Sequence, residues 1–218
     1  MTDSFDAVDL VVLTIAQTAV DNETYFGDLD SVVGDGDFGY SMARGFEQVV
    51  AGFADFDRTD IGTFLKRVAV TITGRIGGTS GPIWGTAFIR AGATAGDRTT
   101  TLTGEDVVAM LRAAIDGIKQ RGGAELGEKT LLDALAPATD TLERELAAGT
   151  GAADALARMA VTARQAADAT KEMVAMRGRA AYTGERSRGS VDAGATAVAV
   201  MLERISAAWA AKYTEEAS

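Results

Sequence analysis

Apolar residues recur with helical spacing along almost the whole chain. Five segments place them three and four positions apart, as one buried helix face requires. These segments are 5–19, 61–72, 107–118, 131–146 and 198–209. Three weaker segments, rich in alanine or bounded by glycine, are 40–53, 82–95 and 151–175. No segment alternates apolar and polar residues convincingly with the period of two that a strand needs. The pattern therefore predicts an all-α fold of about eight helices.

The length and composition favour one domain over the whole chain, residues 1–218. With 218 residues, of which 47% are apolar, the chain is long enough to bury a sizeable core. Only two prolines interrupt the helical pattern, which favours long helices. No linker, charge run or low-complexity segment divides the sequence. We therefore expect a single-domain helical bundle.

The residue types that the chain lacks exclude several classes of catalytic and metal site. The chain has no cysteine and no histidine, which excludes thiolate and imidazole metal sites and a Ser-His-Asp triad. Its net charge of −10 argues against nucleic-acid and anionic-membrane partners. No apolar run approaches the ~20 residues of a membrane span, and the first residues are acidic rather than leader-like. We expect a cytoplasmic protein whose chemistry rests on carboxylates, Lys and Arg, hydroxyls and backbone amides.

Glycines are concentrated between the predicted helices. The 25 glycines cluster at 34–39, 74–81, 117–127 and 178–194. Glycine is costly inside a helix, and simple connections would need fewer of them. Several of these loops must therefore turn sharply or bring backbone close to a ligand.

The first glycine-rich loop carries acidic residues. Its glycines match the dinucleotide pattern G-x-G-x-x-G, but no adequate strand precedes it and its carboxylates would repel a pyrophosphate. Asp35 and Asp37 project to the same side of an extended loop, and Asp30 lies close enough in sequence to join them. Carboxylates combined with phosphate oxygens are the ligands that Mg²⁺ prefers. The alternative is that these residues only cap a helix beginning near Phe38.

The second loop, residues 74–82, combines hydroxyls with a helix start. Pro82 suits the first position of a helix, with Ser80 or Gly81 at the cap. Free amides at that terminus, together with the hydroxyls of Thr79 and Ser80, would bind an anion. An ordinary serine cap explains the same residues equally well.

The third loop, residues 121–130, approximates a phosphate-binding P-loop without matching it. Glu128 separates Gly127 from Lys129, and no strand precedes the loop. Thr130, followed three residues later by Asp133, resembles a capping box. Capping is the favoured interpretation.

The fourth segment, residues 171–194, is basic in an acidic chain. It holds five basic residues against three acidic ones, and arginine binds phosphate through two parallel hydrogen bonds. A nucleotide or phosphorylated substrate is one interpretation, and internal ion pairs are the other. Asp192 then opens the last predicted helix as another capped N-terminus.

Four blocks of sequence together resemble the nucleotide-binding L subunit of dihydroxyacetone kinase. They read GDGDFGYSMARGF, GGTSGPIWGTAFIRAG, GEKTLLDALAPA and MRGRAAYTGERSRGSVDAGAT, in the order and spacing of that family. The resemblance extends over essentially the full length. It implies an eight-helix antiparallel barrel that binds ADP or ATP, through two Mg²⁺ ions, in the glycine-rich loops at one end.

The resemblance also implies which residues form the site. The metal ligands would be Asp30, Asp35 and Asp37. The nucleotide contacts would be Phe38, Gly39, Tyr40, Ser41, Gly78, Thr79, Ser80, Gly122, Thr130, Arg179, Asp192, Ala193 and Gly194. The metal ligands and Arg179 would support phosphoryl transfer, and no residue is assigned as a general base.

In the family, the γ-phosphoryl group passes to a hydroxyl of dihydroxyacetone, which a histidine of a separate K subunit holds covalently. The resemblance therefore implies a K-like partner. The donor is either exchanging ATP or a phosphotransferase-system subunit that rephosphorylates bound ADP. A homodimer is a further expectation, for which exposed Trp84 and Tyr213 would be available.

The sequence departs from the family at two notable positions. Phe38 stands where the family usually has histidine, and Ala193 where it usually has proline. These changes make a sister kinase for a tetrulose such as erythrulose an alternative. A nucleotide-sensing regulatory module, a fatty-acid kinase domain and a helical bundle without a ligand are the other hypotheses.

Overall fold

The computed structural model describes residues 4–99 and 102–213, which form nine α-helices, three short 3₁₀-helices and no strand. The eight long helices are α1 (Ser4–Asp21), α3 (Asp37–Gly52), α4 (Ile61–Thr73), α5 (Ser80–Ala95), α6 (Gly104–Gly122), α7 (Leu132–Ala147), α8 (Ala152–Ala169) and α9 (Ala193–Tyr213). The remaining elements are α2 (Glu23–Ser31), η1 (Phe53–Asp55), η2 (Thr170–Glu172) and η3 (Arg179–Ser187). The all-α prediction is confirmed, and the elements that were not expected are the short helix α2 and the 3₁₀-helix η3.

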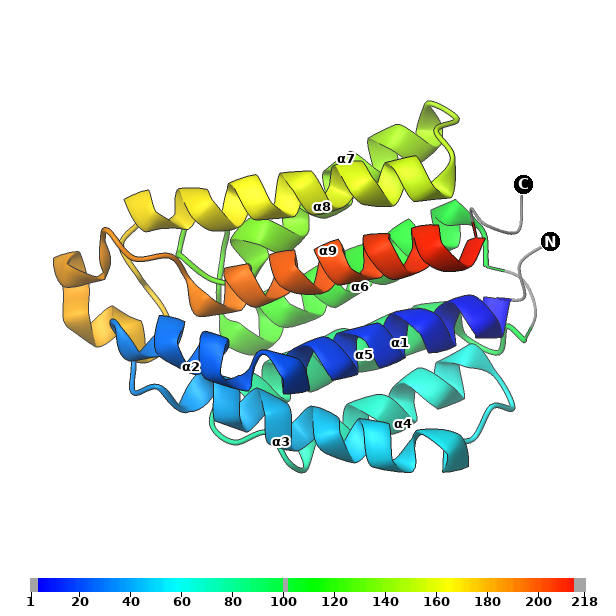
Figure 1. The fold of residues 1–218 in the computed structure, drawn as a ribbon, viewed down its shortest axis with the longest axis horizontal. Coiled ribbons are helices and arrows are strands. Elements are labelled where there is room, and N and C mark those ends of the chain that lie inside the picture. Colours follow the sequence, from blue (N-terminus) through cyan, green and yellow to red (C-terminus); the bar gives the residue numbers. More distant parts are fainter. Residues whose placement is uncertain (1–3, 100–101, 214–218) are drawn as a thin grey trace.

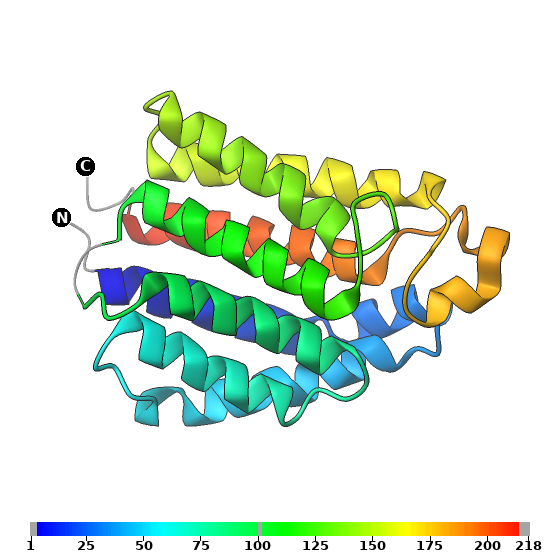
Figure 2. The same ribbon diagram turned by 180° about the vertical axis from the view of Figure 1, so that it is seen from behind.

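The eight long helices form a closed antiparallel ring (Figure 1). Helices α3 to α9 each pack against the next in sequence, α1 packs against α3, and α9 closes the ring on α1. Successive helices run in opposite directions, as the view from behind also shows (Figure 2). Consequently α3, α5, α7 and α9 all begin at the same end of the ring. The loops 32–36, 74–79, 123–131 and 173–192 lie at that end.

The core inside the ring follows the predicted apolar spacing. Phe46, Phe64 and Ile72 are completely buried, and the ring of Phe5 meets Phe64 edge-on with centroids 6.0 Å apart. The expectation that Trp84 is exposed for a subunit contact is wrong. Its side chain is 8% exposed and its ring meets Phe46 edge-on at 6.4 Å, because α5 turns this position inward. Tyr213 is half-buried, with its ring packed on Trp209 at 4.6 Å.

Glycine allows two helices to approach closely. Gly62, in the first turn of α4, faces the carbonyl oxygens of Gly92 and Gly96 at the end of α5. Its amide donates to the Gly96 oxygen at 3.1 Å. A Cβ atom at position 62 would collide with both oxygens. This contact fixes the α4–α5 pair that carries the second glycine-rich loop.

Helix starts differ in how they are capped. Asp60 caps α4 by accepting from the Thr63 amide at 2.6 Å, and Thr103 forms a capping box at the start of α6. The prediction that Pro82 is the first residue of its helix is wrong. Helix α5 begins two residues earlier at Ser80, and Ile83 N already donates to Thr79 O at 3.2 Å. Proline is tolerated there because its missing amide lies within the first turn.

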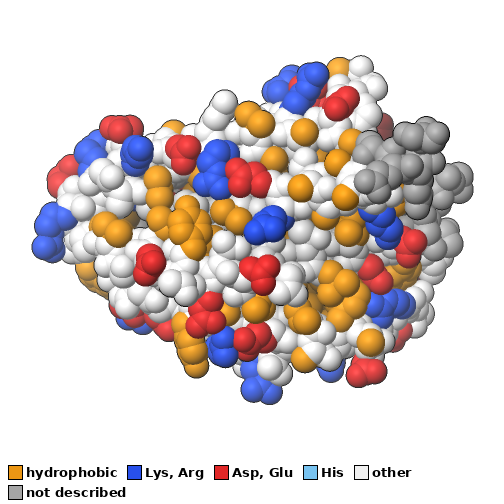
Figure 3. All heavy atoms as spheres, viewed as in Figure 1, with side chains coloured by type: hydrophobic (Ala, Val, Ile, Leu, Met, Phe, Trp, Pro, Cys, Tyr) orange, Lys and Arg blue, Asp and Glu red, His pale blue; other side chains and the backbone are white. Residues whose placement is uncertain are grey.

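The face of the molecule drawn in Figure 3 mixes acidic and basic side chains, with apolar groups scattered between them. No continuous basic area appears on that face. None of the helices in the described part of the chain is both long enough and apolar enough to cross a membrane.

Candidate functional site

A cavity of about 560 Å³ opens at the end of the ring where α3, α5, α7 and α9 begin. Its volume is within the usual range for small-molecule and cofactor sites. All four glycine-rich loops contribute to its lining. The four loops that the sequence singled out therefore meet at one cavity.

Fourteen of the sixteen predicted site residues line this cavity. They are Asp30, Asp35, Asp37, Phe38, Ser41, Gly78, Thr79, Ser80, Gly122, Thr130, Arg179, Asp192, Ala193 and Gly194. Gly39 and Tyr40 do not. Gly39 is buried against the backbone of α2 at Glu23 and Gly27, and Tyr40 is 55% exposed beneath the guanidinium of Arg44.

The period of α3 explains both exceptions. The helix already begins at Asp37, so positions 37, 38 and 41 share the face that looks into the cavity. Positions 39 and 40 turn toward α2 and solvent. Residues 38–41 therefore do not line the cavity as one continuous stretch, and the nucleotide contacts predicted for Gly39 and Tyr40 stay predictions.

The three predicted metal ligands occupy one wall. Asp30 accepts from the Gly36 amide at 2.9 Å, and Asp37 accepts from the Ser41 hydroxyl at 2.9 Å. Burial raises the pKa of Asp30, and the charge of Asp35 raises it further, while backbone amides oppose both effects. Asp35 forms an ion pair with Arg179 across the mouth of the cavity.

This donor set fits Mg²⁺ shared with phosphate better than a cation held by protein alone. Among the described residues, no three carboxylates come close enough to form a metal cage. Mg²⁺ typically takes one or two carboxylates and completes its octahedron with phosphate oxygens and water. The oxygens are hard ligands on one wall of a cavity large enough for a phosphorylated ligand, so the residues fit the ion.

A fourth carboxylate, Asp192, also lines the cavity. Its Oδ1 accepts from the Ala195 amide at 2.7 Å, which caps α9 as predicted. Burial raises the pKa of Asp192 to about 7, and the negative charges of Asp133 and Asp30 add to this effect. The cavity therefore concentrates negative charge that a cation would relieve.

The other walls supply groups for an anion and an apolar ring. The first turns of α3, α5, α7 and α9 border the cavity, and N-terminal amides and helix dipoles favour anions. Ile83, Ile118 and Leu132 form an apolar wall that the sequence did not reveal, because these residues continue ordinary core faces. Phe38 packs on Phe26, with centroids 6.1 Å apart, at its border.

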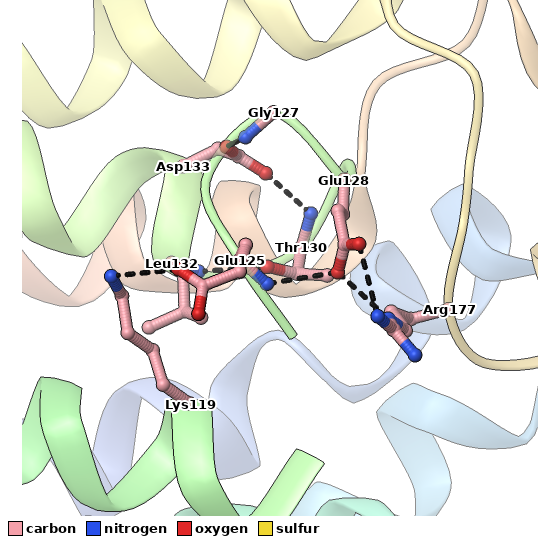
Figure 4. Close-up of polar contacts among 8 residues, drawn as sticks. All are labelled: Lys119, Glu125, Gly127, Glu128, Thr130, Leu132, Asp133 and Arg177. Carbon is pink, nitrogen blue, oxygen red and sulfur yellow. Dashed lines mark hydrogen bonds and ion pairs between the residues drawn. The ribbon is translucent and has the colours of Figure 1, made fainter. Parts of the chain in front are cut away.

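The third and fourth loops are tied together beside the cavity (Figure 4). Glu128 holds Arg177 through two hydrogen bonds of 2.7 and 2.9 Å. Asp133 accepts from the amides of Thr130 at 2.7 Å and Gly127 at 2.5 Å. The predicted Thr130–Asp133 capping box is only half formed, because the Thr130 hydroxyl accepts from the Leu132 amide instead and Leu131 occupies the cap position of α7. Three of the five basic residues of the fourth segment, Arg177, Arg179 and Arg188, pair with acidic side chains of the same chain, as the alternative explanation for the basic excess expects.

Comparison with known proteins identifies the family. The sequence model of the DAK2 domain matches residues 32–207. The chain belongs to this family. The ADP-binding subunit DhaL of the PEP-dependent dihydroxyacetone kinase of Escherichia coli is 40% identical over 84% of this chain and 87% of its own length. A subunit of the same description from Listeria innocua is 33% identical, over 84% of this chain and 85% of its own length.

Two further similar proteins are longer than this chain. The L-erythrulose 1-kinase of Mycolicibacterium smegmatis is 36% identical over 89% of this chain, which spans 34% of that protein. The crystal structure of the dihydroxyacetone kinase from C. freundii in complex with AMP-PNP and Mg²⁺ superposes with a TM-score of 0.72 at 24% identity, covering 95% of this chain and 34% of that one. The DAK2 fold of the described residues is thus confirmed.

Proposed function

We propose that this chain is the nucleotide-binding subunit of a dihydroxyacetone kinase, a phosphotransferase that acts on an alcohol group. The observation that carries the proposal is the cavity, which is lined both by four helix N-termini and by the carboxylates of Asp30, Asp35 and Asp37. The ADP-binding subunits at 33–40% identity over most of both chains support it. The proposal includes residues 1–218 as one domain, and a cytoplasmic location stays a prediction.

Different cavity residues would bind the metal ion and the phosphates of a nucleotide. Asp30, Asp35 and Asp37 would hold Mg²⁺, two ions as the family resemblance implies, against the phosphates. Bound there, the metal would neutralise charge on the transferring phosphoryl group. The hydroxyls of Thr79 and Ser80 lie at the start of α5, where they and nearby amides can donate to phosphate oxygens.

Arg179 and the apolar wall complete the arrangement. Arg179 pairs with Asp35, and its guanidinium could turn to phosphate once a cation occupies that carboxylate. Ile83, Ile118 and Leu132 offer an apolar surface to the base. The chain has no histidine, and we assign no general base to it. We propose that the sugar and the group that activates its hydroxyl belong to a K-like partner subunit.

Two donors fit the same cavity. Relatives described as subunits of PEP-dependent and PTS-dependent kinases favour ADP that stays bound and is rephosphorylated by a partner protein. The other donor is ATP that exchanges. Erythrulose kinases at 35–36% identity favour a tetrulose as the alternative acceptor. We propose the first arrangement, because the relatives of matching length belong to it.

Calorimetric titration of ADP and ATP, with and without Mg²⁺, tests the proposal. Mass spectrometry of the purified protein first establishes whether ADP is retained. We expect Mg²⁺-dependent binding that Asp35→Asn weakens at least tenfold, because one ligand of the shared cation loses its charge. Asp28→Asn is the matched control, since Asp28 is exposed on α2 and does not line the cavity. Absence of nucleotide binding by the native protein would refute the proposal.

A further inference from the structure

Lys129 is a buried cation that donates all the hydrogen bonds of its ammonium to backbone oxygens in residues 173–190, far away in the sequence. Lys129 is only 2% exposed. The ammonium donates to the backbone oxygens of Ser187 at 2.5 Å, Ser190 at 2.6 Å and Met173 at 3.3 Å. An ammonium has three hydrogens, and these three acceptors use all of them. Burial lowers the pKa of Lys129, and the charge of Asp192 opposes that effect.

This geometry separates Lys129 from the lysine of a P-loop. A P-loop lysine keeps its ammonium free for phosphate oxygens. Here the side chain borders the cavity, but its donors point to carbonyl groups of the chain. Lys129 therefore acts on residues 173–190, which we call the strap.

The strap carries the arginine that faces the proposed phosphates. Gly178 and Arg179 line the cavity, and Arg179 pairs with Asp35 on the opposite wall. Within the described chain, the only regular structure in the strap is the 3₁₀ segment η3, which is itself broken at Gly184. Such a segment contributes few helical hydrogen bonds of its own. Its position depends on what holds it to the ring.

Lys129 is the central attachment of the strap. A second, outer attachment is the neighbouring Glu128, whose side chain pairs with Arg177 (Figure 4). The backbone oxygen of Glu128 also accepts from the Met176 amide at 3.0 Å. Lys129 adopts a left-handed backbone conformation, with φ of +61°. A residue with a side chain keeps that conformation only where surrounding contacts enforce it. The three ammonium bonds are such contacts.

We propose that Lys129 is a positioning residue that holds the strap, and Arg179 with it, over the cavity and thereby sets the rate at which nucleotide leaves. The inference rests on the proposed function for its kinetic part only. Removal of the ammonium leaves three carbonyl groups without their shared donor, whereas the ring of helices keeps its core. The strap should then open while the ring stays folded.

The experiment compares Lys129→Met with Lys129→Arg and with the control Lys119→Met. Lys119 lies at the end of α6 beside the same loop, but pairs with the exposed Glu125. Hydrogen exchange without nucleotide reports strap opening, and stopped-flow displacement of a fluorescent ADP analogue with Mg²⁺ reports release. For Lys129→Met we expect exchange protection to be lost in 173–190 alone, and release to be at least about tenfold faster, as charge-assisted hydrogen bonds predict.

Lys129→Arg keeps the charge but cannot place three hydrogens on three converging carbonyls, so we expect an intermediate effect. Lys119→Met should match the native protein. The proposal fails if Lys129→Met leaves strap protection and release unchanged. It fails equally if that variant melts the whole ring, since Lys129 would then serve the global fold. If the native protein binds no ADP, the proposed function falls, and hydrogen exchange alone decides whether Lys129 holds the strap.

Discussion

Replacing Asp192 by asparagine should stabilise the ligand-free protein at alkaline pH. The carboxyl lines the cavity near Asp133 and Asp30, and its pKa rises from 3.8 to about 7 on folding. Asparagine has the same shape and can still accept from the Ala195 amide through its side-chain oxygen, so the cap of α9 is kept. The substitution removes only the charge.

The magnitude follows from the pKa values. A carboxyl with a raised native pKa binds more protons in the folded state, so stability falls as pH rises from about 4 to 7. A pKa of 3.8 in the unfolded chain and about 7 in the folded one corresponds to about 4 kcal/mol above pH 7. Because Asp192 borders a cavity that water enters, we halve this to about 2 kcal/mol.

Urea unfolding between pH 5 and pH 8, without Mg²⁺ or nucleotide, measures the effect. At pH 8 we expect Asp192→Asn to be about 2 kcal/mol more stable than the native protein, or about 4–8 °C higher in Tm. The difference should narrow as pH falls below 7. Asp28→Asn, an exposed position on α2, should show no such difference. Equal or lower stability of Asp192→Asn at pH 8 would refute the reasoning, since Asp192 would then be ionised without cost.

Two further substitutions test the ring and the site end. Gly62→Ala should lower the free energy of unfolding in urea by about 3 kcal/mol, because the new methyl group would collide with the carbonyl oxygens of Gly92 and Gly96 at the end of α5. Gly151→Ala is the control: its methyl group would meet open space, and it should lower that free energy by less than about 1 kcal/mol. Tyr182→Ala should leave the Kd for ADP unchanged, because Tyr182 does not line the cavity. The variant should slow phosphoryl transfer about tenfold in a coupled assay with a K subunit, because the Tyr182 ring is 91% exposed on the strap and is available for contact with a partner. Unchanged transfer would contradict the second expectation.

The architecture could be predicted because helix-period patterning is strong in the eight long helices. The same patterning did not predict α2, because its nine residues bury only Phe26 and leave almost no apolar stripe to detect. The burial of Trp84 was also missed, because residues 82–95 hold several small residues whose inward side is not evident from sequence. Apolar periodicity indicates a helix through the face that the helix buries, and a short or glycine-rich helix has too few large apolar residues to show such a face.

The site was predictable where its residues are unusual for a helical protein. Acids among glycines, and paired hydroxyls before a helix, have few structural uses, and the cavity gathers them. The sequence could not show that Gly39 and Tyr40 turn away from the cavity, because their orientation depends on the exact start of α3. Lys129 was overlooked because its role depends on Met173, Ser187 and Ser190, which are 44–61 residues away.

Antiparallel packing brings as many helix C-termini as N-termini to one end of the ring, so the topology alone does not create an anion-binding end. The loops determine which helix termini face the cavity. All four N-termini at this end border it, whereas α4 and α8 end outside its lining. Of the C-termini that do border it, that of α6 carries Arg121, and that of α2 supplies Asp30, a carboxylate placed for a cation. Glycine-rich loops, which cost stability elsewhere, let the chain expose its positive helix ends selectively in a protein of net charge −10.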